Sequence, residues 1–292
     1  MAFKIGVITD SFRVGMKEAV IKASIIGADG IQFYATTGEM APENLSASQR
    51  KDFLRMLNSY GLKISAICGD LGGHGFINEG ENKWKIEKSK RIMDLAKDLN
   101  TNVVTTHIGV VPEDKNNPRW DIMRNACQSL AEYGDSVGAY FAIETGPERA
   151  AVLKQFLDSL NSKGVRVNMD PANLVMVTGD DPVEAVHILK DYIVHTHAKD
   201  GIMLCKKSPE VIYGLQEDDN KASPAFKEVP LGTGSVDFPR YLRALDSIGF
   251  NGYLTIEREV GDNPEEDINL AVDFLKKTIK EAGLETNYMK SS

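Results

Sequence analysis

The sequence VRVNMDPANLVMVTGDDPVEAVHILKDYIVHTHAKD, residues 165–200, contains a complete strand–helix–strand unit. Residues 165–169 and 192–197 are short, mainly apolar runs with several β-branched side chains, a composition typical of buried strands. Residues 182–189, between them, begin with a proline and have the length of a helix. Two buried strands joined through a helix predict a parallel βαβ unit.

The same alternation of a strand and a helix occurs eight times along the chain. Further strands are expected at residues 4–8, 30–34, 63–68, 102–107, 140–144 and 253–257. Helices are expected after the eight strands at residues 14–26, 47–60, 84–99, 121–137, 149–160, 182–189, 238–248 and 265–282. Eight such units predict an α/β fold, a single-domain (β/α)8 TIM barrel over residues 1–284 with a C-terminal tail at 285–292. An open doubly wound sheet is the alternative, but it usually carries a Gly-rich turn after its first strand, and here that turn is TDSF.

Two of the expected connections are long. Residues 69–83 follow the third strand and residues 200–237 follow the seventh. Long connections in a compact fold usually bind ligands or cover a site. Both leave the carboxyl ends of strands, which is the face where the active sites of barrels lie.

Composition and charge exclude several classes of function. The chain has 34 Lys and Arg against 42 Asp and Glu, a net charge of −8, which argues against binding nucleic acid. No apolar run approaches the roughly 18 residues of a transmembrane helix, and the apolar run near the N-terminus is too short for a signal peptide. Three cysteines far apart in the sequence, Cys68, Cys127 and Cys205, indicate reduced thiols. We therefore expect a cytoplasmic protein.

Charged or ionisable residues end four consecutive strands of the predicted barrel. They are Glu144, Asp170, His197 and Glu257, at the ends of the fifth to eighth strands. Neighbouring strand ends share one rim, so these side chains should converge. Three carboxylates in one place repel one another unless they are protonated or bridged by a cation. A single strand-end carboxylate is more often a helix cap or an ion-pair partner, but four such residues in succession predict one divalent metal ion. Mn²⁺ is expected, with Mg²⁺, Co²⁺ or Zn²⁺ as alternatives.

Five motifs together resemble the xylose isomerase-like TIM-barrel superfamily, in its branch of sugar phosphate isomerases and epimerases. They are IETGPE around Glu144, NMDPANLVM around Asp170, HTHAKDG around His197, LGTGSVDF at residues 231–238 and GYLTIERE around Glu257. The motifs follow the family's order and span the chain. The resemblance implies that Glu144, Asp170, His197 and Glu257 are the metal ligands and that Glu144 and Glu257 are also the acid and base.

The chain departs from the ketose 3-epimerases of this family at two positions. Those enzymes have a histidine three residues after the strand-six aspartate, where this chain has Asn173. They also have an arginine after the strand-seven histidine, where this chain continues Ala198–Lys199–Asp200. The substrate need not therefore be a free ketohexose. The related apurinic endonucleases use three zinc ions and several more histidines, so five histidines and a net charge of −8 argue against DNA repair.

The implied reaction removes a proton from carbon next to a carbonyl group. A metal ion stabilises the enediolate, one carboxylate removes the proton and the other returns it. This predicts an isomerase or epimerase of a ketose, keto-sugar or sugar phosphate. A lyase or dehydratase acting on a keto-sugar or keto-cyclitol shares the first step and stays as an alternative, as does a non-catalytic sugar-binding barrel.

Four further residues are candidates for contacts with a small sugar-derived substrate. They are His107, Asn173, Lys199 and Trp120. His107 is either a substrate contact or a buried, hydrogen-bonded histidine. Lys199 either binds hydroxyl groups or pairs with Asp200, and Trp120 either stacks on a sugar or packs at a helix start. A homo-oligomer is expected by analogy with other barrels of this kind.

Overall fold

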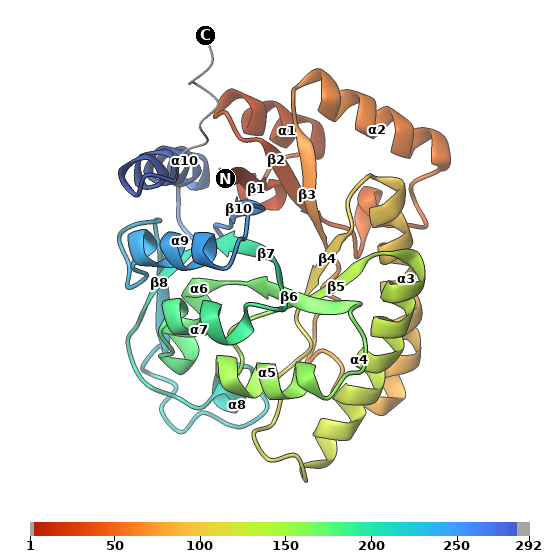
Figure 1. Cartoon of the computed structure of the whole chain (residues 1–292), viewed down its shortest axis with the longest axis vertical. Coiled ribbons are helices and arrows are strands. Elements are labelled where there is room, and N and C mark those ends of the chain that lie inside the picture. Colours follow the sequence, from red (N-terminus) through yellow and green to blue (C-terminus); the bar gives the residue numbers. More distant parts are fainter. Residues whose placement is uncertain (1–2, 285–292) are drawn as a thin grey trace.

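The fold is a closed barrel of eight parallel strands surrounded by helices (Figure 1), as seen in a computed structural model that describes residues 3–284. The predicted tail at 285–292 lies outside the described residues. The barrel strands are β1 (Lys4–Ile8), β2 (Gly30–Tyr34), β3 (Lys63–Cys68), β4 (Val103–Thr106), β5 (Tyr140–Glu144), β6 (Val165–Met169), β7 (Ile193–Ala198) and β10 (Tyr253–Ile256). Strand β1 pairs with both β2 and β10, which closes the barrel. The predicted single-domain TIM barrel is confirmed.

The helices between the strands begin and end where local capping dictates. They are α1 (Met16–Ile25), α2 (Ala47–Ser59), α3 (Glu79–Asp98), α4 (Pro118–Val137), α5 (Ala150–Asp158), α7 (Pro182–Leu189), α9 (Phe238–Ser247) and α10 (Pro264–Glu281). Helices α3 and α4 begin several residues earlier than predicted. The side chains of Asn78 and Asn117 accept hydrogen bonds from the N–H groups of Gly80 and Arg119 and so cap α3 and α4. The connection after β3 is shorter than predicted for this reason.

The long connection after β7 has structure that the sequence did not predict. Strands β8 (Asp200–Met203) and β9 (Phe226–Val229) pair antiparallel, and a short helix, α8 (Pro209–Ile212), lies between them. After β6, the chain turns through a short helix, α6 (Pro171–Asn173), and one π-helical turn, η3 (Leu174–Thr178). Short 3-10 turns follow β1, as η1 (Thr9–Phe12), and β2, as η2 (Gly38–Met40).

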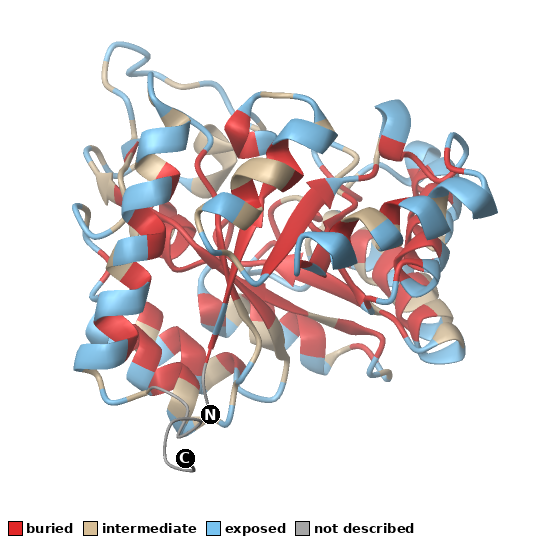
Figure 2. Cartoon of the chain, turned by 90° about the horizontal axis from the view of Figure 1, so that it is seen from above, coloured by how far each residue is buried: buried red, intermediate tan, exposed pale blue. Residues whose placement is uncertain are grey.

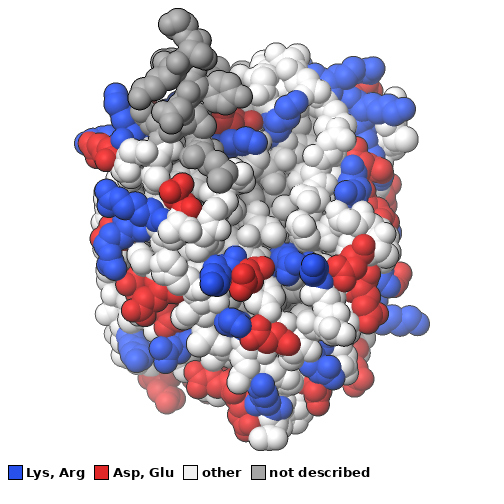
Figure 3. Space-filling view, in the orientation of Figure 1, with Lys and Arg blue, Asp and Glu red and all other residues white. Residues whose placement is uncertain are grey.

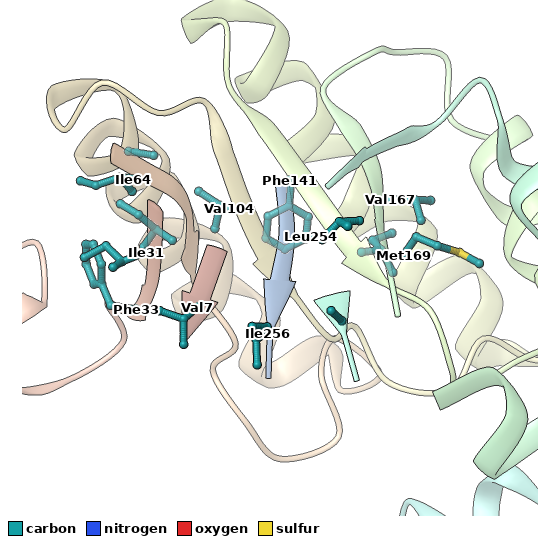
Figure 4. Packing of buried hydrophobic residues seen from close by; sticks show 14 of the residues in the cluster. Val7, Ile31, Phe33, Ile64, Val104, Phe141, Val167, Met169, Leu254 and Ile256 are labelled. Atoms are coloured by element: carbon teal, nitrogen blue, oxygen red, sulfur yellow. The ribbon is translucent and has the colours of Figure 1, made fainter. Parts of the chain in front are cut away.

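The core lies between the strands and the inward faces of the helices. Figure 2 shows buried residues along the strands and exposed residues on the outer faces of the helices. Apolar side chains from the strands, among them Val7, Phe33, Phe141 and Ile256, belong to one buried cluster (Figure 4). Among the described helices, none is both long and apolar enough to cross a membrane.

Candidate metal centre and active site

The structure brings the four strand-end residues together at one rim of the barrel. Glu144 is the last residue of β5, Asp170 directly follows β6, His197 lies in β7 and Glu257 directly follows β10. All four are buried, and one ligand atom from each lies within 4.8 Å of the others. The Nδ1 atom of His197 is 3.3 Å from a Glu257 oxygen, 3.5 Å from Glu144 and 3.6 Å from Asp170. Closure of the barrel thus gathers three carboxylates around one imidazole.

This group fits a divalent cation. The Oδ2 atom of Asp170 is buried and has no hydrogen-bond partner among the described residues, which is costly for a carboxylate oxygen unless a cation meets it. Burial raises the pKa of Asp170. Burial opposes a charge on His197, but Glu144 and Glu257 raise the pKa of its imidazole well above the ordinary value. Without a metal, protons therefore balance the carboxylates, and a bound divalent ion would supply that positive charge instead.

Neighbouring side chains fix the orientation of Glu144. Asn168 and Asn173 each donate a side-chain N–H to it, at 3.1 Å to Oε2 and 3.0 Å to Oε1. Asn173 can approach because Gly146 has no side chain. A Cβ at position 146, where φ is +136°, would lie 2.2 Å from the Cβ of Asn173. Asn173, predicted as a substrate contact, thus holds a proposed metal ligand in place and also lines the cavity described below.

The Lys199 ammonium group lies directly beside Glu257. Its Nζ atom is 3.0 Å from Oε2 of Glu257 and also contacts the Glu259 carboxylate. Strand β10 lies beside β7 in the barrel, and the backbone N–H of Glu257 donates to the carbonyl of Ala198. Burial favours the protonated form of Glu257, but Lys199 and His197 lower its pKa far below the ordinary range. The alternative in which Lys199 pairs with Asp200 is wrong, because the Asp200 carboxylate accepts backbone N–H groups instead.

A cavity of about 260 Å³ opens above the four residues. Glu144, His197 and Glu257 lie on its wall. Another part of the wall is apolar and comes from η3 and from the long connection after β7, namely Met176, Val177, Ile212, Tyr213 and Phe226. The long connection predicted to cover the site therefore contributes to its wall.

His107 follows β4 and lies in the cavity as part of a polar chain. Its Nδ1 atom is 3.0 Å from Oδ2 of Asp70, and its Nε2 atom is 3.6 Å from Oε1 of Glu144. Burial opposes its charge, but Glu144 and Asp70 raise the pKa of His107 to about 9. Sequence reasoning missed Asp70, although this residue stands just beyond β3 and so fits the pattern that identified the four strand-end residues. Tyr213, whose ring centroid is 6.5 Å from that of His107, had no comparable signal because it lies in an irregular connection.

Trp120 is placed in the core and not at the cavity. The residue is 4% exposed, and its ring meets Phe156 edge to face, with centroids 5.3 Å apart. Because α4 begins at Pro118, Trp120 lies within its first turn and points toward α5. The predicted sugar contact at Trp120 is therefore replaced by a packing role.

Comparisons with known proteins agree with this architecture. A sequence profile of the family described as xylose isomerase-like TIM barrel matches residues 20–278. The crystal structure of a xylose isomerase domain protein from Planctomyces limnophilus superposes with a TM-score of 0.79 at 23% identity, covering 97% of this chain and 99% of that one. At that identity the likeness shows the fold alone.

Two curated relatives have named activities. The L-ribulose-5-phosphate 3-epimerase UlaE of Escherichia coli is 22% identical over 90% of this chain and 89% of its own length. The inosose dehydratase of Geobacillus thermodenitrificans is 25% identical over 54% of this chain and 54% of its own length. An uncharacterised protein of Methanocaldococcus jannaschii is likewise matched over only 59% of its length. The profile match over most of the sequence shows that the chain belongs to the xylose isomerase-like TIM-barrel family.

Proposed function

We propose that the chain is a divalent-metal-dependent isomerase or epimerase of a ketose, keto-sugar or sugar phosphate. The observation that carries the proposal is the set of four converging ligand residues, with an Asp170 oxygen that accepts no hydrogen bond from the described residues, below a cavity of small-molecule size. The similarity to an epimerase over 89% of that enzyme's length supports the same reading.

Glu144, Asp170, His197 and Glu257 would hold the metal ion. Once bound, the ion would act as a Lewis acid toward a carbonyl oxygen and stabilise the enediolate. Glu144 and Glu257 both line the cavity, and β6 and β7 separate their strands around the barrel. In this proposal the two carboxylates would reach a substrate from different sides. One would remove the proton from carbon, and the other would return it to the same carbon or to its neighbour.

Other features of the proposal follow from the donor set and the surface. Three carboxylates and one imidazole suit Mn²⁺, with Mg²⁺, Co²⁺ or Zn²⁺ as alternatives. The face drawn in Figure 3 mixes basic and acidic side chains instead of presenting a continuous basic surface, which supports a small sugar-derived substrate over a nucleic acid. We also propose a cytoplasmic location, without membrane attachment, and a homo-oligomeric state.

A dehydratase or lyase acting on a keto-sugar or keto-cyclitol is the second candidate. It would share the proton abstraction and then expel a hydroxyl group, which needs a proton donor. His107 stands in the cavity between Asp70 and Glu144, and in this proposal it would donate that proton. The similarity to an inosose dehydratase over 54% of that enzyme favours testing this reaction.

The two reactions differ in the mass of the product. The chelator-treated protein is reloaded with Mn²⁺ and incubated in D₂O with a panel of ketoses, keto-sugars and keto-cyclitols. An isomerase or epimerase incorporates deuterium without losing water, whereas a dehydratase loses the mass of one water molecule. The variants Glu144→Gln and Glu257→Gln should each lower kcat by about 10²–10⁴-fold. The control variant Asp273→Asn, on the exposed face of α10, should keep full activity. Absence of both deuterium uptake and water loss across the panel, with metal bound, would contradict the proposal.

A further inference from the structure

We propose that the substrate of this site is uncharged, an unphosphorylated ketose, keto-sugar or keto-cyclitol. This inference rests on the proposed function and narrows its substrate class. The inference comes from three observations: the charges of the residues that line the cavity, the partners of the nearby cations, and the carboxylate bound by the Gly-rich loop at residues 231–236.

Carboxylates dominate the cavity. Of the described residues that line it, five carry a carboxylate, one is a lysine and none is an arginine. The carboxylates are Asp70, Glu144, Glu228, Glu257 and Glu259. A bound divalent ion would offset two negative charges, Lys199 and the protonated His107 would offset two more, and Asp170 below the ion adds one, so the formal charge of the site stays negative. The His107 ring is itself paired, with its Nδ1 atom 3.0 Å from the Asp70 carboxylate. A phosphate group carries about −1.5 to −2 charges at neutral pH, so it would enter a site of its own sign.

The cations near the cavity already have anionic or carbonyl partners. Lys199 contacts both Glu257 and Glu259, and only 5% of its side chain is exposed. Arg258 donates to Glu228 at 2.6 Å and to Asp267 at 2.8 Å. These cations would have to leave buried carboxylates unpaired in order to bind a phosphate, which is costly.

A third cation, Arg13, is exposed. It follows η1, on the same face of the barrel as the site, and is not among the residues that line the cavity. Its guanidinium group donates to the backbone carbonyls of Glu259 and Gly261, at 3.0 and 2.9 Å. Arg13 therefore holds the segment after β10 and is not directed at the ligand space.

The Gly-rich sequence LGTGSV at residues 231–236 already encloses an anion. Its backbone N–H groups at Gly232, Gly234 and Val236 donate to the Asp200 carboxylate at 3.0, 2.9 and 3.1 Å, and Gly201 adds a fourth N–H at 2.9 Å. The fit is close, because a Cβ at position 234 would lie 2.2 Å from Oδ1 of Asp200. Loops of this kind bind phosphates in other proteins. Here the Asp200 carboxylate accepts the backbone N–H groups that would otherwise be free to bind a phosphate.

The rest of the wall suits a neutral polyol. Met176, Val177, Ile212 and Phe226 make part of the wall apolar, and the carboxylates of the wall supply hydrogen-bond acceptors. Carboxylate oxygens accept hydrogen bonds from hydroxyl groups, and apolar side chains contact the C–H faces of a sugar. A volume of about 260 Å³ also leaves little room beyond one small ligand.

The test compares matched pairs of substrates. The Mn²⁺-loaded enzyme is assayed with D-ribulose and D-ribulose 5-phosphate, and with D-fructose and D-fructose 6-phosphate. The neutral member of the pair that reacts should have a kcat/KM at least about tenfold higher. Raising the ionic strength should narrow the difference, since salt screens repulsion between charges.

A charge variant at the cavity tests whether a phosphorylated substrate is disfavoured by charge repulsion or by the shape of the cavity. Glu259→Gln should raise the kcat/KM for the phosphorylated member relative to the neutral one by about two- to fivefold, since one nearby negative charge is lost. Asp273→Asn, which removes the same charge far from the cavity on α10, should leave that ratio unchanged.

The outcomes distinguish this inference from the function on which it rests. Faster turnover of a phosphorylated member overturns the inference and leaves the proposed function intact. If the metal-loaded enzyme turns over neither member of any pair, and the panel of ketoses, keto-sugars and keto-cyclitols shows neither deuterium uptake nor water loss, the proposed function is wrong and the inference falls with it.

Discussion

Replacing Lys199 by methionine tests how the site balances its charges. Methionine keeps most of the length and apolar contact of lysine and removes the ammonium group. The Nζ atom is 3.0 Å from Glu257, and the two side chains are only 5% and 7% exposed. At an effective dielectric of about 20, that separation corresponds to about 5–6 kcal/mol of attraction. Removing one partner of a buried pair costs about 3–5 kcal/mol, so the metal-free variant should lose this much free energy of unfolding.

The assay is urea unfolding of both proteins, with and without Mn²⁺. Because a metal ion would supply another positive partner to Glu257, the loss should shrink when Mn²⁺ is present. The stability that Lys199→Met loses should also depend on pH. Lys199 holds the pKa of Glu257 below its ordinary value of 4.5, so this stabilisation is present above that pH and is lost as the pH falls further. The difference between the two proteins should thus be full at pH 7 and smaller in acid.

Glu259→Gln is the matched control, because it removes the other carboxylate that contacts Lys199. Its side chain is 56% exposed, so its ion pair should contribute at most about 1 kcal/mol. A loss below about 1 kcal/mol for metal-free Lys199→Met, or a loss that Mn²⁺ leaves unchanged, would refute the charge balance described here.

Three other variants test separate parts of the structure. Burial raises the pKa of Glu148 from 4.5 to about 8. Between these pH values the free energy of unfolding of the wild type, measured in urea, should fall by about 1.4 kcal/mol per pH unit relative to that of Glu148→Gln. The same dependence on pH in both proteins would contradict a buried, protonated Glu148. Trp120→Ala should lower the free energy of unfolding by about 3–5 kcal/mol in the same assay and leave KM unchanged. A raised KM would instead support a contact between Trp120 and the sugar. Gly146→Ala should displace Asn173 from Glu144 and weaken Mn²⁺ binding by about 10–100-fold in a calorimetric titration, and unaltered affinity would show that this hydrogen bond does not position the ligand.

The fold and the four strand-end residues could be predicted because both depend on local patterns. Short apolar runs mark the strands, and each lies within one residue of its predicted bounds. The bounds of a strand then identify the residue at its carboxyl end, and closure of the barrel brings these ends to one rim. Glu144 and Glu257 are far apart in the sequence yet meet His197 for this reason.

The contacts that tune the site could not be predicted, because they depend on the direction of side chains beyond the strand ends and on where the helices begin. Lys199 follows the last residue of β7, and its side chain turns toward Glu257 at the end of the neighbouring β10, a direction that the strand pattern does not give. Trp120 turns into the core because Asn117 starts α4 earlier than the sequence pattern indicated. Tyr213 reaches the cavity from a connection folded by the β8–β9 hairpin, whose four-residue strands carry too little pattern to be recognised.

Metal content tests the central claim most directly. Elemental analysis and Mn²⁺ titration are made on the wild-type protein, on the double variant Glu144→Gln/Glu257→Gln and on Asp273→Asn, all purified without a chelator or a metal-affinity column. The double variant leaves Lys199 with Glu259 as its remaining carboxylate partner, so circular dichroism first establishes that this variant is folded. One equivalent of divalent metal in the wild type and in Asp273→Asn, lost in the double variant, is the predicted result. A folded wild-type protein that binds no metal after Mn²⁺ is added, or a double variant that binds it equally well, would contradict the four-residue metal site.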